Sequence, residues 1–78
     1  MSKDSSKQKL LKIFKINLKI KGKFRENYKI YSVKTWDSLA NFNILLDIEK
    51  KFSVKFNSKE FSNLNSFKEI YKNVKKKI

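Results

Sequence analysis

The chain has 78 residues and a formal net charge of +13, with 20 Lys or Arg against 7 Asp or Glu. It contains no cysteine and no histidine, which excludes disulfides, the usual zinc sites and Cys–His or Ser–His nucleophile pairs. A single glycine and no proline leave no glycine-rich phosphate loop and no flexible linker. A chain this short has a small core and little room for an enzyme's pocket. We therefore expect one non-catalytic domain over residues 1–78.

Residues 1–6 are polar and expected to be flexible, and the segment after them carries two conflicting patterns. Residues 16–20 and 28–30 alternate between apolar and polar, as the two strands of a β-hairpin would. Propensity is nearly neutral, because lysine and leucine favour helix while isoleucine, phenylalanine and tyrosine favour strand. The pattern also fits a helix near residues 7–20, whose apolar face is Leu10, Leu11, Phe14 and Leu18.

The next element is a helix over residues 38–51. Asp37 and Ser38 are residue types favoured at helix starts. Apolar residues then recur at helical spacing and predict one continuous buried face, made of Leu39, Phe42, Leu45, Leu46, Ile48 and Phe52. The polar residues expected largely off that face are Asn41, Asn43, Asp47 and Lys50.

Two further helices are expected over residues 58–63 and 66–76. Asn57 precedes Glu60 by three residues, and Ser66 precedes Glu69 by the same spacing, which is the pattern of a capping box. The last helix continues with apolar residues at helical spacing and ends in lysines, which suit a helix C-terminus. Its apolar residues are Phe67, Ile70, Tyr71 and Val74.

The run Trp36, Asp37, Ser38 and Leu39, which opens the second of these helices, resembles the prosthetic-group attachment site of acyl carrier proteins. A serine at a helix N-terminus can hold a phosphodiester, because unpaired backbone N–H groups and the positive end of the helix dipole both favour an anion. A bare Asp-Ser-Leu tripeptide would indicate only a helix cap. Here the resemblance extends over residues 28–74.

The resemblance implies an all-α fold, a small four-helix acyl-carrier-like bundle with a long loop between helices 1 and 2. It selects the helix over the hairpin in the first third, which periodicity alone leaves open. A long loop must be held by buried side chains, and the candidates are Phe24, Tyr28, Ile30, Val33 and Trp36. The core is expected to include Leu45, Ile48, Phe52, Phe56, Leu64 and Ile70.

The function that the resemblance implies is that of a carrier. A phosphopantetheinyl transferase using coenzyme A and magnesium would attach 4'-phosphopantetheine to Ser38, and the thiol of that arm would hold an acyl group as a thioester. Asp37 would cap the helix and assist the metal site of the transferase. The chain itself would bind no metal. Acyl-loading and acyl-transfer enzymes would be its partners, and the docking residues would be Leu39, Asn43, Leu46 and Asp47.

Charge separates this chain from the carrier proteins that it resembles, which are typically acidic. Residues 1–34 and 67–78 are strongly basic, whereas residues 35–66 carry equal numbers of basic and acidic side chains. Asn43, Lys50 and Lys51 stand where acidic residues are usual, and Trp36 stands where glycine is common. This departure indicates a specialised acyl-transfer or biosynthetic pathway within fatty-acid and lipid metabolism.

Two other functions stay open. One is an unmodified, carrier-like subunit that binds another protein, and the other is a basic nucleic-acid-binding domain. No specific nucleic-acid site is expected, because Arg25 is the only arginine and most aromatic residues fall on predicted core faces. A basic helix over residues 9–21 could rest on an anionic membrane, although the bundle needs its apolar side. The lysine excess also fits an AT-rich coding sequence.

No segment of the sequence is long and apolar enough to span a membrane, and its start does not resemble a signal-peptide core. We therefore expect a cytoplasmic protein. We also expect it to be a monomer.

Overall fold

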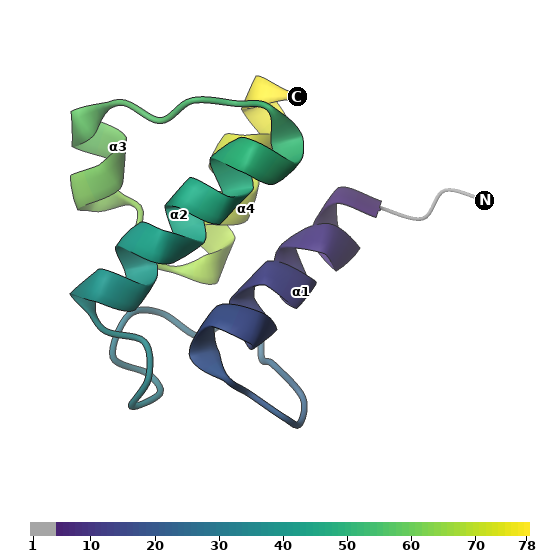
Figure 1. The fold of residues 1–78 in the computed structure, drawn as a ribbon, viewed down its shortest axis with the longest axis vertical. Helices are drawn as coiled ribbons and strands as arrows, with labels where there is room; N and C mark the ends of the chain where they lie inside the picture. The colour runs from purple at the N-terminus through teal and green to yellow at the C-terminus, as the bar shows by residue number, and fades with distance from the viewer. Residues whose placement is uncertain (1–4) are drawn as a thin grey trace.

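The computed structural model describes residues 5–78, which form four α-helices and no strand (Figure 1). They are α1 (Ser5–Leu18), α2 (Ser38–Phe52), α3 (Ser58–Asn63) and α4 (Phe67–Lys77). All four predicted helices are therefore confirmed, within two residues at each end, and the β-hairpin alternative is wrong. Of the segment expected to be flexible, residues 1–4 lie outside the described residues, and Ser5 and Ser6 belong to α1.

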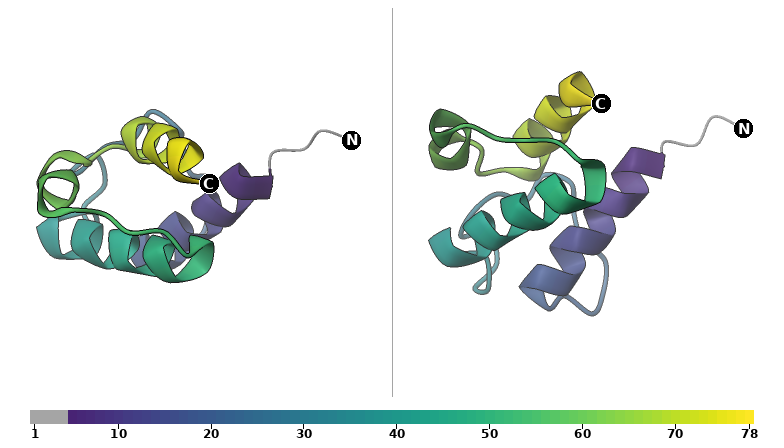
Figure 2. Two further views of the ribbon diagram at one scale, coloured as in Figure 1. Left: turned by 90° about the horizontal axis from the view of Figure 1, so that it is seen from above. Right: turned by 45° about the horizontal axis from the view of Figure 1, so that its top comes forward.

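The helices surround a single interior. α1 runs alongside α2 in the opposite direction (Figure 1) and contacts both α2 and α4. Seen from above in Figure 2, α2 and α4 lie on opposite sides of the interior, and α3 lies at the end away from α1. No helix of residues 5–78 has both the length and the apolar character that crossing a bilayer requires.

Backbone geometry explains where the two longest helices end. Lys19 after α1 and Ser53 after α2 both adopt the left-handed conformation, with φ of 57° and 56°. The N–H of Ile20 donates to the carbonyl of Lys15 at 3.0 Å, and the N–H of Val54 donates to that of Glu49 at 3.2 Å. Both are the six-to-one bonds of a Schellman motif, whose left-handed residue is commonly glycine.

An aromatic cluster fills the middle of the core. The Phe14 ring on α1 lies 5.3 Å from the Trp36 ring and 5.1 Å from the Phe67 ring of α4, both edge-on. Phe24 joins it at 5.4 Å from Phe14. Aromatic pairs at these distances add to the free energy that burial supplies. Around the cluster lie the other buried apolar residues, Leu10, Ile13, Leu18, Ile44, Leu45, Ile48, Val54, Phe56, Ile70 and Val74.

Four of the six predicted core residues are buried, namely Leu45, Ile48, Phe56 and Ile70, while Phe52 and Leu64 are partly buried against the core. The predicted face of α2 needs a correction. Asn41 is buried, whereas the Leu39 and Phe42 side chains are 68% and 47% exposed. The buried stripe runs instead through residues 41, 44, 45 and 48, because the loop before α2 supplies a buried polar partner for Asn41.

Residues 19–37 connect α1 to α2 without a helix. Phe24 and Trp36 are buried, and the other three expected anchors, Tyr28, Ile30 and Val33, are partly buried against the core. The segment is also bound to the start of α4: the N–H of Ile30 donates to the Asn65 carbonyl at 2.8 Å, and that of Phe67 donates to the Tyr28 carbonyl at 3.1 Å.

Candidate functional site

Ser38 is the first residue of α2, and its side chain is exposed. Asp37 is the N-cap: its Oδ1 accepts a hydrogen bond from the Ala40 N–H at 2.9 Å, and its carbonyl accepts one from the Asn41 N–H at 2.9 Å. Within residues 5–78, no hydrogen bond uses the N–H groups of Ser38 and Leu39. The helix start therefore keeps two donors for an anion beside the Ser38 hydroxyl.

The Ser38 hydroxyl has a tyrosine as its neighbour. Tyr31 Oη lies 3.2 Å from Ser38 Oγ, and either atom could be the donor. The Tyr31 side chain is 69% exposed, and its backbone has a φ of 69°, a conformation that costs a non-glycine residue free energy. A bond of 2.7 Å from the Tyr31 N–H to the Trp36 carbonyl holds this turn. Sequence reasoning missed Tyr31, because nothing in the pattern around it indicates a left-handed residue.

The contact between Tyr31 and Ser38 shows which group lies next to the Ser38 hydroxyl. An activated serine nucleophile needs a neighbouring base such as histidine or lysine. Within the described chain, the hydroxyl has only the phenol of Tyr31 within hydrogen-bonding distance. Among residues 5–78, the group that contacts Ser38 Oγ is thus a phenol rather than a histidine or a lysine.

An open hollow of about 410 Å³ lies beside Ser38, between the 19–37 segment, α2 and α3. It is lined by Ile30, Tyr31, Ser38, Asn41, Phe61, Ser62 and Asn65. Its lining is mixed, with hydroxyl and amide groups next to the Ile30 and Phe61 side chains.

A buried hydrogen-bond chain fixes the position of the helix start. The indole N–H of Trp36 donates to Asn41 Oδ1 at 2.9 Å, and Asn41 Nδ2 donates to the Leu64 carbonyl at 2.9 Å. Asn41 thereby joins the residue two positions before Ser38 to the end of α3. Buried polar groups of this kind are costly to leave unpaired.

The structure brings three of the four predicted docking residues together. Asn43, Leu46 and Asp47 line one open hollow of about 670 Å³ along α2. Leu39 does not line it and lies at the N-terminal end of the helix. The carboxylate of Asp47 is engaged, because its Oδ2 accepts a hydrogen bond of 2.8 Å from Asn17 of α1.

Phe42 adds an exposed apolar surface that sequence reasoning placed in the core. Its ring lies 5.1 Å from that of Phe61 on α3. Together with Leu39 it leaves two large apolar side chains open to solvent on the first two turns of α2. Both lie close in sequence to Ser38.

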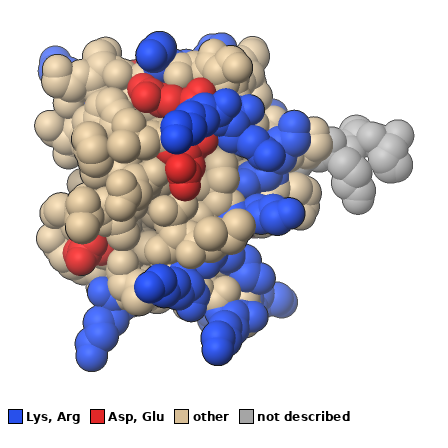
Figure 3. Space-filling view, in the orientation of Figure 1, with Lys and Arg blue, Asp and Glu red and all other residues tan. Residues whose placement is uncertain are grey.

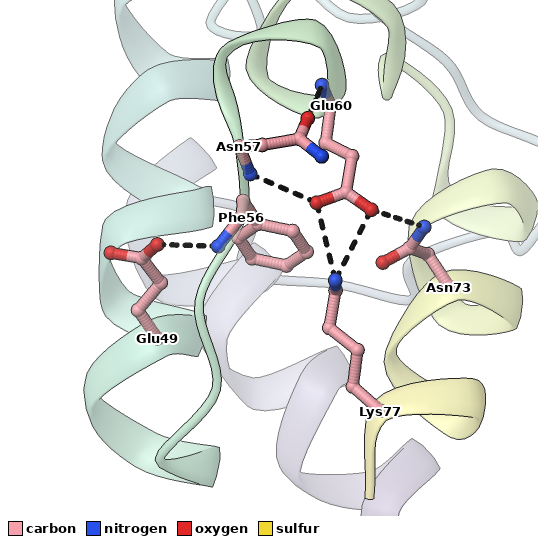
Figure 4. A network of polar contacts seen from close by, with 6 residues as sticks. All are labelled: Glu49, Phe56, Asn57, Glu60, Asn73 and Lys77. Carbon is pink, nitrogen blue, oxygen red and sulfur yellow. Dashed lines mark hydrogen bonds and ion pairs between the residues drawn. The ribbon is translucent and has the colours of Figure 1, made fainter.

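A second polar network joins α3 to α4 and lies apart from Ser38 (Figure 4). Glu60 and Asn57 form a complete capping box at the start of α3. Glu60 Oε2 also accepts bonds of 3.1 Å from Asn73 Nδ2 and from Lys77 Nζ. The hydrogen bond from the Asn57 backbone is the main reason that the pKa of Glu60 lies below its ordinary value, and the Asn73 and Lys77 contacts lower the pKa further. In the adjoining turn, Glu49 Oε2 accepts from the Phe56 N–H at 2.7 Å.

The acidic residues do not assemble into a metal centre within the part of the chain that the structure describes. Comparison of the chain with known protein families, with curated proteins and with solved structures finds no match.

Proposed function

We propose that this protein is an acyl carrier whose Ser38 is the attachment point for a 4'-phosphopantetheine arm. The observation that carries the proposal is the placement of Ser38: an exposed hydroxyl at the start of the 15-residue helix α2, capped by Asp37 and adjacent to two unused backbone N–H groups. These features fit a phosphodiester on Ser38 Oγ. The resemblance of residues 28–74 to carrier proteins supplies the identity of the group.

The chemistry of attachment belongs to a transferase. The Ser38 oxygen would form a bond to the phosphopantetheinyl phosphorus of coenzyme A, the bond from that phosphorus to the adenosine-side phosphate would break, and the serine proton would pass to the transferase. Asp37 would assist the transferase's magnesium site. When bound, the arm supplies the thiol that the chain lacks, and that thiol holds an acyl group as a thioester.

The partners of such a carrier are its transferase and the enzymes that load and remove the acyl group. Leu39, Asn43, Leu46 and Asp47 remain the proposed docking residues, and the exposed Phe42 joins them. The departure from the usual acidic charge of such carriers favours a specialised biosynthetic pathway over general fatty-acid synthesis. The proposed carrier is a cytoplasmic monomer.

A second candidate function rests on the exposed apolar pair Leu39 and Phe42. Exposed apolar side chains grouped on one helix suit a protein interface. An unmodified carrier-like subunit that binds another protein through α2 would use the same surface without any group on Ser38.

The test is modification in vitro. Incubation with coenzyme A, magnesium and a broad-specificity phosphopantetheinyl transferase should add one phosphopantetheinyl group, measured by intact mass and located by peptide mapping. The chain has nine serines, so finding the group on Ser38 alone would be a stringent test of the proposal. Ser38→Ala should abolish the addition, and Ser62→Ala, which changes a serine of the same hollow, should not.

Two results would contradict the carrier proposal. One is modification that survives Ser38→Ala. The other is a well-folded sample that several such transferases leave unmodified, which would favour the interaction subunit instead.

A further inference from the structure

Six lysines of this chain lie on one surface, which α1, the segment after it and the end of α2 share. Figure 3 shows blue side chains along the right and lower parts of the molecule, over α1 and the loop that follows it. Two open hollows, of about 500 and 550 Å³, lie along α1. Between them they are lined by six lysines, here called the lysine surface: Lys9, Lys12, Lys15, Lys23, Lys50 and Lys51.

Among residues 5–78, no ion pair joins these six lysines to a carboxylate. Asp47 is the one acidic residue that lines either hollow, and its Oδ2 is bonded to the neutral amide of Asn17. The ion pairs found among residues 5–78 lie elsewhere, between Lys7 and Glu26 and between Lys77 and Glu60. The lysine surface therefore presents a concentrated positive potential to solvent.

An apolar side chain lies in the middle of this surface. Ile16 lines both hollows and is 66% exposed. The core-facing side of α1 is occupied separately, by Leu10, Ile13, Phe14 and Leu18. The helix can therefore present lysines and Ile16 outward without giving up the face that the bundle needs.

The composition of the surface distinguishes between classes of anionic partner. Protein interfaces are enriched in arginine and aromatic residues and depleted in lysine, and Arg25 lines neither hollow. Single-stranded nucleic acid is commonly held by aromatic stacking, but the exposed aromatic residues Tyr31 and Phe42 line neither hollow of the lysine surface. Lysines around an exposed aliphatic side chain are what an anionic lipid surface attracts.

We propose that the lysine surface and Ile16 bind the surface of a bilayer containing anionic phospholipid. Ser38 would stay accessible on the bound protein, because it lines neither hollow of the lysine surface and instead lines the separate hollow between the 19–37 segment, α2 and α3. The protein would then work next to a membrane, with its candidate attachment site free for a partner. Membrane binding does not depend on modification of Ser38, so the two proposals fail or succeed separately.

The experiment is co-sedimentation of the full chain with vesicles of phosphatidylcholine alone and of phosphatidylcholine mixed with phosphatidylglycerol. Binding is expected to the mixed vesicles only, and to weaken as salt is added. Replacing Lys9, Lys12, Lys50 and Lys51 by glutamine should weaken partitioning by about fivefold for each lysine removed. The matched control replaces Lys34, Lys59, Lys68 and Lys72, four exposed lysines outside both hollows, and should change binding much less.

The role of Ile16 needs its own readout. Because the chain has no cysteine, Ile16→Cys can carry a single polarity-sensitive dye, whose emission should shift to the blue on mixed vesicles. A dye on Asn63→Cys, at the exposed end of α3, should not shift. Ile16→Ser should weaken partitioning by about tenfold.

Three results would overturn the proposal, provided that circular dichroism shows the variants to be folded. Equal losses from the two quadruple variants would mean that net charge alone drives binding. An unchanged emission from the dye at position 16 would mean that this face does not meet the lipid. Binding to a duplex oligonucleotide or to polyglutamate at concentrations where mixed vesicles are not bound would assign the lysines to another polyanion.

Discussion

Asn41 shows how one side chain can decide the local structure of the candidate site. It is a buried polar residue whose oxygen accepts from Trp36 and whose nitrogen donates to the Leu64 carbonyl. The side-chain amide of Asn41 therefore fixes the loop before Ser38 and the end of α3 to α2. No apolar side chain can make both bonds.

Asn41→Ala should lower the free energy of unfolding by about 2–4 kcal/mol, because it leaves a buried indole N–H and a carbonyl without partners. Urea unfolding followed by circular dichroism measures the change. Asn43→Ala is the control, since Asn43 is exposed on the same helix. It should change the free energy of unfolding by only a few tenths of the change expected for Asn41→Ala. Equal effects from the two variants would mean that the buried amide does not hold the site together.

The helix ends provide a test at the level of the element. Ser53 closes α2 in the left-handed conformation, with a φ of 56° and a ψ of 45°, and its side chain is exposed. Glycine adopts this conformation without the steric cost that a Cβ atom brings, although it loses more chain entropy on folding.

Ser53→Gly should therefore stabilise the protein by about 0.5–1 kcal/mol, which corresponds to a rise in Tm of a few degrees for a domain of this size. Thermal unfolding measures the change. Lys50→Gly, an exposed change inside the last turn of the same helix, should instead destabilise by about 1 kcal/mol. A loss of stability from Ser53→Gly would contradict the left-handed cap.

The capping box of α3 predicts a dependence on pH. Because the pKa of Glu60 is lowered in the folded protein, its carboxylate stabilises the fold fully above the ordinary glutamate pKa, about 4.3. That stabilisation is lost as the pH falls through the lowered, folded-state pKa.

Glu60→Gln should therefore lower the urea midpoint at neutral pH, and the difference from the unaltered protein should shrink as the pH falls below about 4. Glu69→Gln, at the corresponding position of the first turn of α4, controls for the loss of one acidic charge near a helix start. A difference that stays constant down to acidic pH would mean that the Glu60 carboxylate is not the source of the stabilisation.

For the whole molecule, the main electrostatic feature is the excess of lysine, which lies on the N-terminal and C-terminal thirds. Like charges on so small a domain repel one another and oppose the compact state. Salt screens that repulsion over about 10 Å at 0.1 M.

The melting temperature should therefore rise as sodium chloride is added at constant pH, measured by circular dichroism. The variant in which Lys9, Lys12, Lys50 and Lys51 become glutamine should start higher at low salt and respond less to salt. A melting temperature indifferent to salt would show that repulsion among the lysines does not limit stability.

The parts of the structure that the sequence predicts are those controlled by neighbours in the chain. Asn57 and Ser66 indicate the starts of α3 and α4 because a cap acts on N–H groups two or three residues away. The sequence leaves α1 ambiguous, because its helix and strand propensities nearly cancel, and only the resemblance favours the helix there.

The features that the sequence did not reveal depend on distant partners. The Asn41 amide is buried because it hydrogen-bonds to the Trp36 indole and to the Leu64 carbonyl. The buried face of α2 therefore includes position 41, and Phe42 lies off that face. The contact of Tyr31 with Ser38 depends on a left-handed turn without glycine. At the candidate site, the sequence thus indicated Asp37 and Ser38 but not the residues that surround them.

Trp36 gives the molecule a built-in optical probe. It is the only tryptophan of the chain, its ring is fully buried, and its N–H is bonded to Asn41. Indole emission depends on the polarity and hydrogen bonding around the ring, so the tryptophan emission of this protein reports on the segment just before Ser38. An event at Ser38 that displaces that segment should be visible in the tryptophan spectrum of the unlabelled chain, in real time and without a substitution.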